Sequence, residues 1–131
     1  MVAIDEIQNH PMIKEVISDI DASVSYFLAR PPHYGMSKWS SLQATEKALK
    51  AYLRKMEIDF PRNHNLSILS RLATENGLFQ IPMVTINEIQ CAAGVRYGEI
   101  EINTYEAYRA HLASIKVCGI IAKRIQSQAV E

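Results

Sequence analysis

Apolar residues recur at steps of three and four through most of the chain, the spacing that places side chains on one face of an α-helix. The first such segment runs from Pro11 to Ala29. Pro11 suits the first turn of a helix, and Arg30-Pro31-Pro32 ends it because proline cannot continue a helix. The buried stripe of this helix is predicted to contain Ile13, Val16, Ile17, Ile20, Val24, Phe27 and Leu28.

Two further helices are predicted before the middle of the chain. One runs from Ser37, as N-cap, to Met56 and buries Leu42, Leu49, Leu53 and Met56, with Trp39 at the edge of the stripe. Pro61 breaks the pattern in the loop that follows. A shorter helix over 65–75 begins at the capping residue Asn65, buries Leu66, Leu69 and Leu72, and ends at Asn76-Gly77.

The second half of the chain predicts two more helices. Pro82 opens one that ends near Gly94. Residues 96–103 form a connector with Gly98 as a bend, because a lone short strand has no partner. Thr104 caps the last helix, which runs to Ser127. One side of this helix carries Tyr108, Leu112, Ile115, Cys118, Ala122 and Ile125, and another carries Ala110, Val117 and Ile121. A helix that is apolar on more than one side is central in a bundle or lies at a dimer interface.

These elements predict one all-α domain over residues 1–131, a four- to five-helix up-and-down bundle in which residues 1–10 form a leading segment. A chain of 131 residues fits one domain with one core, and a hydrophobic fraction of 48% is sufficient to fill it. No run of 18 apolar residues and no leader pattern occurs, so a cytoplasmic location without a membrane span is expected.

Charge and cysteine usage exclude several classes of protein. The 14 basic and 14 acidic residues balance, which argues against a dedicated polybasic nucleic-acid binder but leaves room for a local basic patch. Cys91 and Cys118 stand in no CxxC spacing, and the histidines lack metal-ligand spacing. A phosphate-binding Gly-x(4)-Gly-Lys loop is also absent. We expect neither a metal nor another cofactor.

Three landmarks resemble the HEPN (higher eukaryotes and prokaryotes nucleotide-binding) family. The segment from Leu42 to Leu53, LQATEKALKAYL, is similar to the second helix of HEPN domains. The loop Phe60-Pro-Arg-Asn-His64-Asn-Leu66 is similar to the family's proline–histidine–leucine loop, and Val95-Arg96-Tyr97-Gly98 is similar to its Arg-Tyr element. They occur in the family's order and cover roughly residues 37–125, so the resemblance implies the HEPN helical bundle.

The resemblance implies two classes of activity. Many HEPN proteins are metal-independent ribonucleases, often dimers, with an Arg-x(4–6)-His motif at the last helix. Others pair with nucleotidyltransferases, as in toxin–antitoxin systems, or bind nucleotide or RNA without cleaving it. This sequence contains no Arg-x(4–6)-His, since Arg30/His33, Arg62/His64 and Arg109/His111 are spaced too closely.

A polar stripe on the second predicted helix is the first candidate site. Gln43, Lys47, Lys50 and Arg54 recur at steps of four, three and four, so they share one face. Three cations on one face suit phosphate binding through charge-assisted hydrogen bonds. The alternative is a solvated helix face, with Glu46 paired to Lys50.

The loop residues could extend this site. His64 and Arg62 precede a helix start, where free backbone N–H groups attract anions, although His64 could equally shape the turn. Glu46 lies at the boundary of the core stripe and needs a partner, for which Arg96 is a candidate. The ligand-binding residues predicted from the sequence are therefore Lys47, Lys50, Arg54, Arg62, His64 and Arg96.

His111 is the only further candidate for catalysis. It lies in the apolar stripe of the last helix, where a lone histidine is usually a hydrogen-bonded core residue. Catalysis would need Arg96 or a second subunit to supply the positive group.

Three functions fit this pattern. The first is a noncatalytic HEPN-like module that binds nucleotide or RNA phosphates, with a nucleotidyltransferase as a candidate partner. The second is a metal-independent ribonuclease with a degenerate Arg96/His111 site completed across a homodimer. The third is a helical scaffold whose last helix dimerises and whose charges only solvate it.

Overall fold

The computed structural model describes residues 11–62 and 64–129. These residues form five α-helices, one 3₁₀ helix and no strand, which confirms the all-α class. The elements are α2 (Pro11–Leu28), α3 (Tyr34–Lys55), α4 (Leu66–Glu75), α5 (Met83–Ile89), the 3₁₀ helix η1 (Ala93–Tyr97) and α6 (Thr104–Ala129). The predicted leading segment 1–10 lies outside the described residues. Every helix in the described part of the chain is too short or too polar to cross a membrane.

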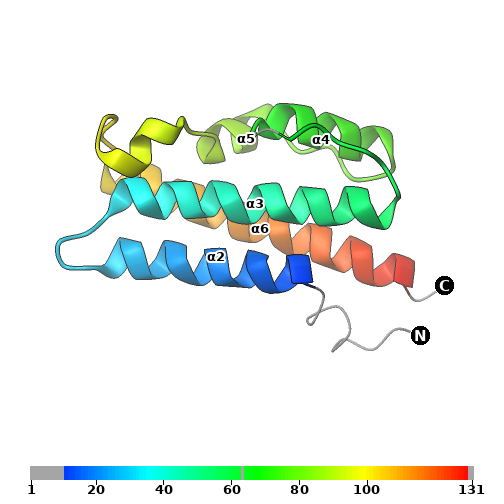
Figure 1. Ribbon diagram of the computed structural model, residues 1–131, viewed down its shortest axis with the longest axis horizontal. Helices are drawn as coiled ribbons and strands as arrows, with labels where there is room; N and C mark the ends of the chain where they lie inside the picture. The colour runs from blue at the N-terminus through cyan, green and yellow to red at the C-terminus, as the bar shows by residue number, and fades with distance from the viewer. Residues whose placement is uncertain (1–10, 63, 130–131) are drawn as a thin grey trace.

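The long helices α2, α3 and α6 lie side by side, and α4 and α5 cover the other side of α3 (Figure 1). Consecutive long helices α2 and α3 run in opposite directions (Figure 1). Helix α3 packs against α2, α6, α4, α5 and η1, so it is the central element of the bundle. The sequence predicted a central or interfacial role for the last helix, α6, which packs against α3, α5 and α2.

Helix α3 is buried on most of its circumference although its sequence is only moderately apolar. Besides leucines, its buried positions hold alanines and hydroxyl residues, namely Ala44, Ala48, Ala51, Ser37, Ser40, Ser41 and Thr45. Small side chains reduce the distance at which two helices pack, so neighbours approach α3 closely on several sides. A central position therefore does not require a uniformly apolar helix.

Hydroxyl groups satisfy one another where α2 and α6 meet α3. The Ser23 Oγ atom of α2 lies 2.9 Å from Ser41 Oγ and 3.3 Å from Ser37 Oγ. On the α6 side, Thr45 donates to Ser114 Oγ at 2.9 Å, and Ser114 donates to the Ser41 carbonyl at 3.0 Å. Buried hydroxyls that are paired in this way avoid the cost of unsatisfied polar groups.

Of the three helices predicted in the first half of the chain, two agree with the structure and one begins at a different residue. Helices α2 and α4 agree with prediction, and Asn65 caps α4 by accepting from the N–H groups of Ser67 and Ile68 at 2.9 and 3.3 Å. Helix α3 begins at Tyr34, so Ser37 is not its N-cap. Ser37 is instead buried and donates to the Ser23 carbonyl at 2.8 Å.

The helices of the second half differ more from prediction. Helix α5 ends at Ile89 because Gln90 is extended, and its side chain accepts from the Leu66 N–H at 2.8 Å. The cap of α6 is Asn103 rather than Thr104. Asn103 accepts from the Glu106 N–H at 2.8 Å, and Glu106 accepts from the Asn103 N–H at 3.2 Å, the reciprocal pattern of a capping box.

Several residues of the predicted core stripes face solvent. Ile17, Val24 and Leu28 of α2 and Tyr108, Leu112 and Ile115 of α6 are exposed. The buried residues come from both predicted sides of α6: Ala110, Val117 and Ile121 from the second side, and Cys118 and Ile125 from the first. Periodicity correctly found apolar residues on two sides of α6, but it did not indicate which of these residues are buried.

Gly35 fixes the position of η1 against the start of α3. A Cβ atom at Gly35 would lie 2.1 Å from the Val95 carbonyl oxygen, a distance that two unbonded atoms cannot occupy. Only glycine therefore allows the backbone of η1 to approach α3 this closely. The approach places Arg96, the residue after Val95, beside Trp39 of α3.

We predict that Gly35→Ala destabilises the protein by roughly 1–3 kcal/mol, because the backbone of η1 must move. Gly119→Ala is the matched control. A Cβ atom there meets nothing within 4 Å in the middle of α6, so the change should stabilise the protein by about 0.5–1 kcal/mol. Urea unfolding of both variants measures the difference, and equal effects would contradict the proposed contact.

Candidate functional site

A buried carboxylate on α3 organises the loop before α4. Glu46 is only 2% exposed. Its two carboxylate oxygens lie 2.8 and 2.9 Å from His64 Nδ1, and Oε1 also accepts from Lys50 Nζ at 3.1 Å. A buried carboxylate requires such partners, because desolvation of an unpaired charge is costly. The described contacts do not include a Glu46–Arg96 pair, so that prediction is wrong. The alternative partner of Glu46, Lys50, is confirmed.

The contact with Glu46 also fixes the chemistry of the His64 ring. A carboxylate oxygen accepts, so Nδ1 carries a proton in this contact, and Nε2 makes no hydrogen bond with the described residues. The His64 side chain is 61% exposed, and its ring lies 5.6 Å from that of Trp39. His64 thus has one buried and one accessible edge.

Arg96 is held by aromatic rings rather than by a carboxylate. Its guanidinium carbon lies 4.3 Å from the Trp39 ring centroid and 4.9 Å from that of Tyr97. Trp39 is 8% exposed and Tyr97 is 69% exposed. Arg96 forms no ion pair with any described residue, so its charge is not neutralised locally within that part of the chain.

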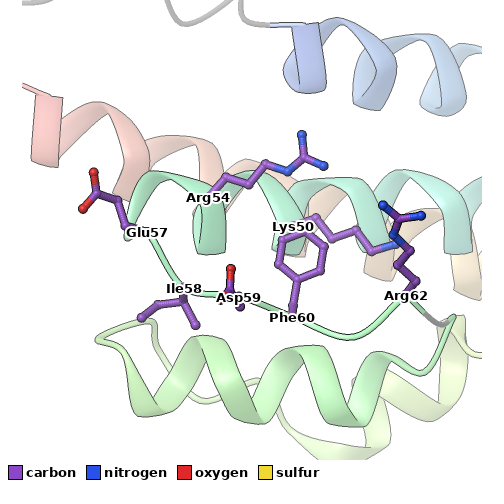
Figure 2. A pocket seen from close by; sticks show the side chains of 7 residues that line it. All are labelled: Lys50, Arg54, Glu57, Ile58, Asp59, Phe60 and Arg62. Atoms are coloured by element: carbon purple, nitrogen blue, oxygen red, sulfur yellow. The ribbon is translucent and has the colours of Figure 1, made fainter.

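Lys50, Arg54 and Arg62 line an open pocket of about 540 Å³ between α3 and the loop that follows it. Lys50 Nζ and the Arg54 guanidinium carbon lie 5.9 and 5.7 Å from the centroid of the Phe60 ring. Figure 2 shows the three cationic side chains around Phe60, with Glu57 at the far end of the pocket. The structure thus brings three of the six predicted ligand-binding residues to one pocket.

Acidic groups moderate the charge of this pocket. Glu57 and Asp59 also line it, and Lys50 is already paired with Glu46. Arg54 and Arg62 form no ion pair with a described residue, so they supply its accessible positive charge. The fork geometry of guanidinium groups suits phosphate oxygens.

The other predicted ligand-binding residues lie apart from this pocket. Lys47 points to α2, where its Nζ lies 2.8 Å from Asp19 Oδ2. His64 lines a second open pocket of about 710 Å³ together with Trp39, Asn65, Gln90 and Cys91. Arg96 lines a third pocket, beside Tyr34 and Gly98. Lys47 therefore joins α3 to α2 through its ion pair with Asp19. His64 and Arg96 line two other pockets.

His111 lies in the hydroxyl cluster and not beside Arg96. Its Nδ1 lies 3.0 Å from Ser23 Oγ, and partial burial lowers the pKa of the imidazole. No described contact joins it to Arg96, whose neighbours are Trp39 and Tyr97. A hydrogen-bonded, half-buried histidine is the arrangement expected for a residue with a packing role.

The cysteines do not form a reactive or metal-binding site. Burial raises the pKa of both Cys91 and Cys118 to about 11, so both thiols are protonated at neutral pH. The described residues contain no group of three histidine, cysteine, aspartate or glutamate side chains that could hold a metal ion.

Sequence reasoning missed the aromatic residues of the site. Trp39 was expected at the edge of a core stripe and Phe60 was only part of a loop motif. Each carries a cationic side chain over its ring. The sequence contained no local signal for these pairs, because Phe60 meets Lys50 and Arg54, ten and six positions before it, and Trp39 meets Arg96, 57 positions after it.

We predict that His64→Ala destabilises the protein by about 2 kcal/mol, because it removes the strongest hydrogen bonds of a buried carboxylate. In a Glu46→Gln background the same change should cost less than about 1 kcal/mol, since no buried charge is left without a partner. Urea unfolding of the four proteins in this cycle measures the coupling. Additive effects would show that the Glu46–His64 contact does not stabilise the fold.

Comparison with known families agrees with the resemblance found in the sequence. The HEPN domain family matches residues 20–118, a range that contains α3, α4, α5, η1, Glu46, His64 and Arg96. No curated protein and no solved structure matches the chain. Since the family match covers most of the chain and the described residues form a helical bundle, this protein belongs to the HEPN domain family.

Proposed function

We propose that the protein binds nucleotide phosphates in the pocket formed by Lys50, Arg54, Phe60 and Arg62, and that it does so without catalysis. One observation carries the proposal. The guanidinium groups of Arg54 and Arg62 lie around the Phe60 ring in an open pocket. Neither group has an ion-pair partner among the described residues. Guanidinium groups bind phosphate oxygens, and an aromatic face stacks a base. Family membership adds a general relation to nucleotides and RNA.

Within one chain, the described contacts do not assemble the site that the ribonuclease hypothesis requires. Metal-independent cleavage needs a base at the ribose hydroxyl and a cation at the phosphorane. Arg96 stacks on Trp39, whereas His111 bonds to Ser23 in the hydroxyl cluster. The two residues proposed for that chemistry therefore have no common partner among the described contacts.

Binding is tested by titration with ADP and with pyrophosphate at low ionic strength, monitored by calorimetry. Arg54→Gln and Arg62→Gln should each weaken ADP binding about tenfold, because each removes charge-assisted hydrogen bonds. Lys123→Gln, an exposed change on α6, is the control and should have no effect.

A further variant is expected to strengthen ADP binding rather than weaken it. Asp59→Asn removes a negative charge from the pocket lining and should strengthen ADP binding. Unchanged affinity in Arg54→Gln and Arg62→Gln, or no ADP binding by the unmodified protein, would reject this pocket as the phosphate site.

A separate observation supports self-association. The exposed apolar residues of α2 and α6 form two neighbouring stripes. The stripes meet where the rings of Phe27 and Tyr108 are in contact, with 6.4 Å between their centroids. We propose that a second copy of the chain covers them. Asp21 lies within the α2 stripe and Lys116 within the α6 stripe, so a two-fold arrangement that places α2 on the partner's α6 pairs opposite charges twice.

Light scattering tests this surface. The unmodified protein should have the mass of a dimer, and Leu112→Glu should produce a monomer because the charge would be buried in the interface. Val84→Glu places the same charge on another exposed apolar residue, outside the α2 and α6 stripes, and should leave the dimer intact. A monomeric unmodified protein at high concentration would exclude the interface.

A further inference from the structure

His111 lies at the junction of the two apolar stripes that form the proposed dimer surface. On α6 it comes three residues after Tyr108 and four before Ile115, two exposed members of the α6 stripe. On its other side, Nδ1 lies 3.0 Å from the Oγ atom of Ser23 in α2. His111 is half-buried in the single chain. A second copy that covers both stripes would therefore cover this histidine as well.

The hydroxyl cluster around His111 is compatible with either protonation state of the ring. Ser37 donates its hydroxyl proton to the Ser23 carbonyl at 2.8 Å, and Ser41 donates to the Ser37 carbonyl at 3.3 Å. Ser23 Oγ has one proton, which it can donate to His111 Nδ1 at 3.0 Å or to Ser41 Oγ at 2.9 Å. When Nδ1 is protonated, Ser23 accepts from it and donates to Ser41. The single chain thus accommodates a charged His111.

The cluster supplies no negative charge to an imidazolium at this position. Charged residues on the neighbouring turns of α2, α3 and α6 are Asp19, Asp21, Lys38, Lys47, Arg109 and Lys116. Asp19 and Lys47 are bound to each other at 2.8 Å. Arg109 is bound to Glu88 of α5 at 2.6 Å. Burial is the cause that lowers the pKa of the His111 imidazole, so its surroundings favour the neutral ring.

We infer that acidification dissociates the proposed dimer, because protonation of His111 places a positive charge beneath the apolar surface that the second copy covers. A neutral ring can be buried there with Nδ1 bonded to Ser23. An imidazolium would lose its contact with water without gaining a counter-ion, which is costly. This inference rests on the proposed self-association and adds its regulation by pH.

The direction of the pH effect follows from burial. The pKa of His111 is already lowered in the single chain, and a second copy that removes more water lowers it further. Two separate chains therefore bind more protons than one dimer once the pH falls below the ordinary histidine value of about 6.5. Association is fully favoured above that pH and is lost progressively below it. Two histidines titrate in each dimer, so their effects multiply.

Sedimentation velocity of the unmodified protein over a range of concentrations tests this inference. The dissociation constant of the dimer should rise at least about tenfold between about pH 7.5 and about pH 5, a range in which most carboxylates and lysines keep their charge. Circular dichroism at both pH values verifies that the chain remains folded, so that a loss of dimer is not a loss of the fold.

Two histidine variants assign the effect to one side chain. His111→Gln cannot be protonated but keeps an amide that can bond to Ser23, so its dissociation constant should be the same at both pH values. His33→Gln is the matched control. It changes an exposed histidine in the loop between α2 and α3 and should keep the tenfold change.

A measurement on the unmodified protein covers the case in which His111→Gln does not fold or associate. Proton binding and self-association affect each other reciprocally. The midpoint of the His111 titration, followed by nuclear magnetic resonance, should therefore fall as the protein concentration is raised. A midpoint that does not depend on concentration would contradict the inference.

The possible outcomes separate this inference from the proposed self-association. A dimer whose dissociation constant does not change with pH, or changes equally in His111→Gln, overturns the role of His111 and leaves the dimer intact. A protein that is monomeric at about pH 7.5 and high concentration overturns the dimer together with this inference.

Discussion

The arrangement of charge in this protein depends on the burial of one carboxylate. Glu46 has 2% of its surface exposed in the middle of the central helix, and it holds His64 and Lys50. Loss of either partner would leave a buried charge uncompensated. Glu46 therefore anchors the loop before α4 to α3. The hollow beside Trp39 and the Phe60 pocket lie on either side of that anchor.

The basic residues differ in whether they form ion pairs, although the acidic and basic residues of the whole chain are equal in number. Lys47 and Lys50 are neutralised by Asp19 and Glu46, and Arg109 is bound to Glu88 at 2.6 Å. Arg54, Arg62 and Arg96 are without such partners in the described part of the chain and lie next to aromatic rings or in open pockets. A zero net charge is therefore compatible with a local site for anions.

Hydroxyl residues are buried beside the apolar core of this bundle, whereas several apolar residues of α2 and α6 are exposed. Hydroxyl and alanine side chains allow close packing around α3, and their polar atoms are paired with one another. Apolar residues on α2 and α6 consequently remain outside the core, where Leu28, Tyr108 and Leu112 face solvent. The structure thus combines a central α3 with exposed apolar residues on the outer surface of α2 and α6.

The sequence by itself determined the helical class, the positions of α2 and α4, the cap at Asn65 and the family, because these depend on local periodicity, capping and short motifs. It also supplied the candidate cations. The tertiary structure decided which apolar residues of α6 are buried, that Glu46 pairs with His64 rather than Arg96, and that Lys47 is engaged by α2. These outcomes depend on residues far apart in the sequence meeting in space: 18 positions for Glu46 and His64, 28 for Asp19 and Lys47, and 69 for Thr45 of α3 and Ser114 of α6. Helical spacing within one segment cannot specify such contacts.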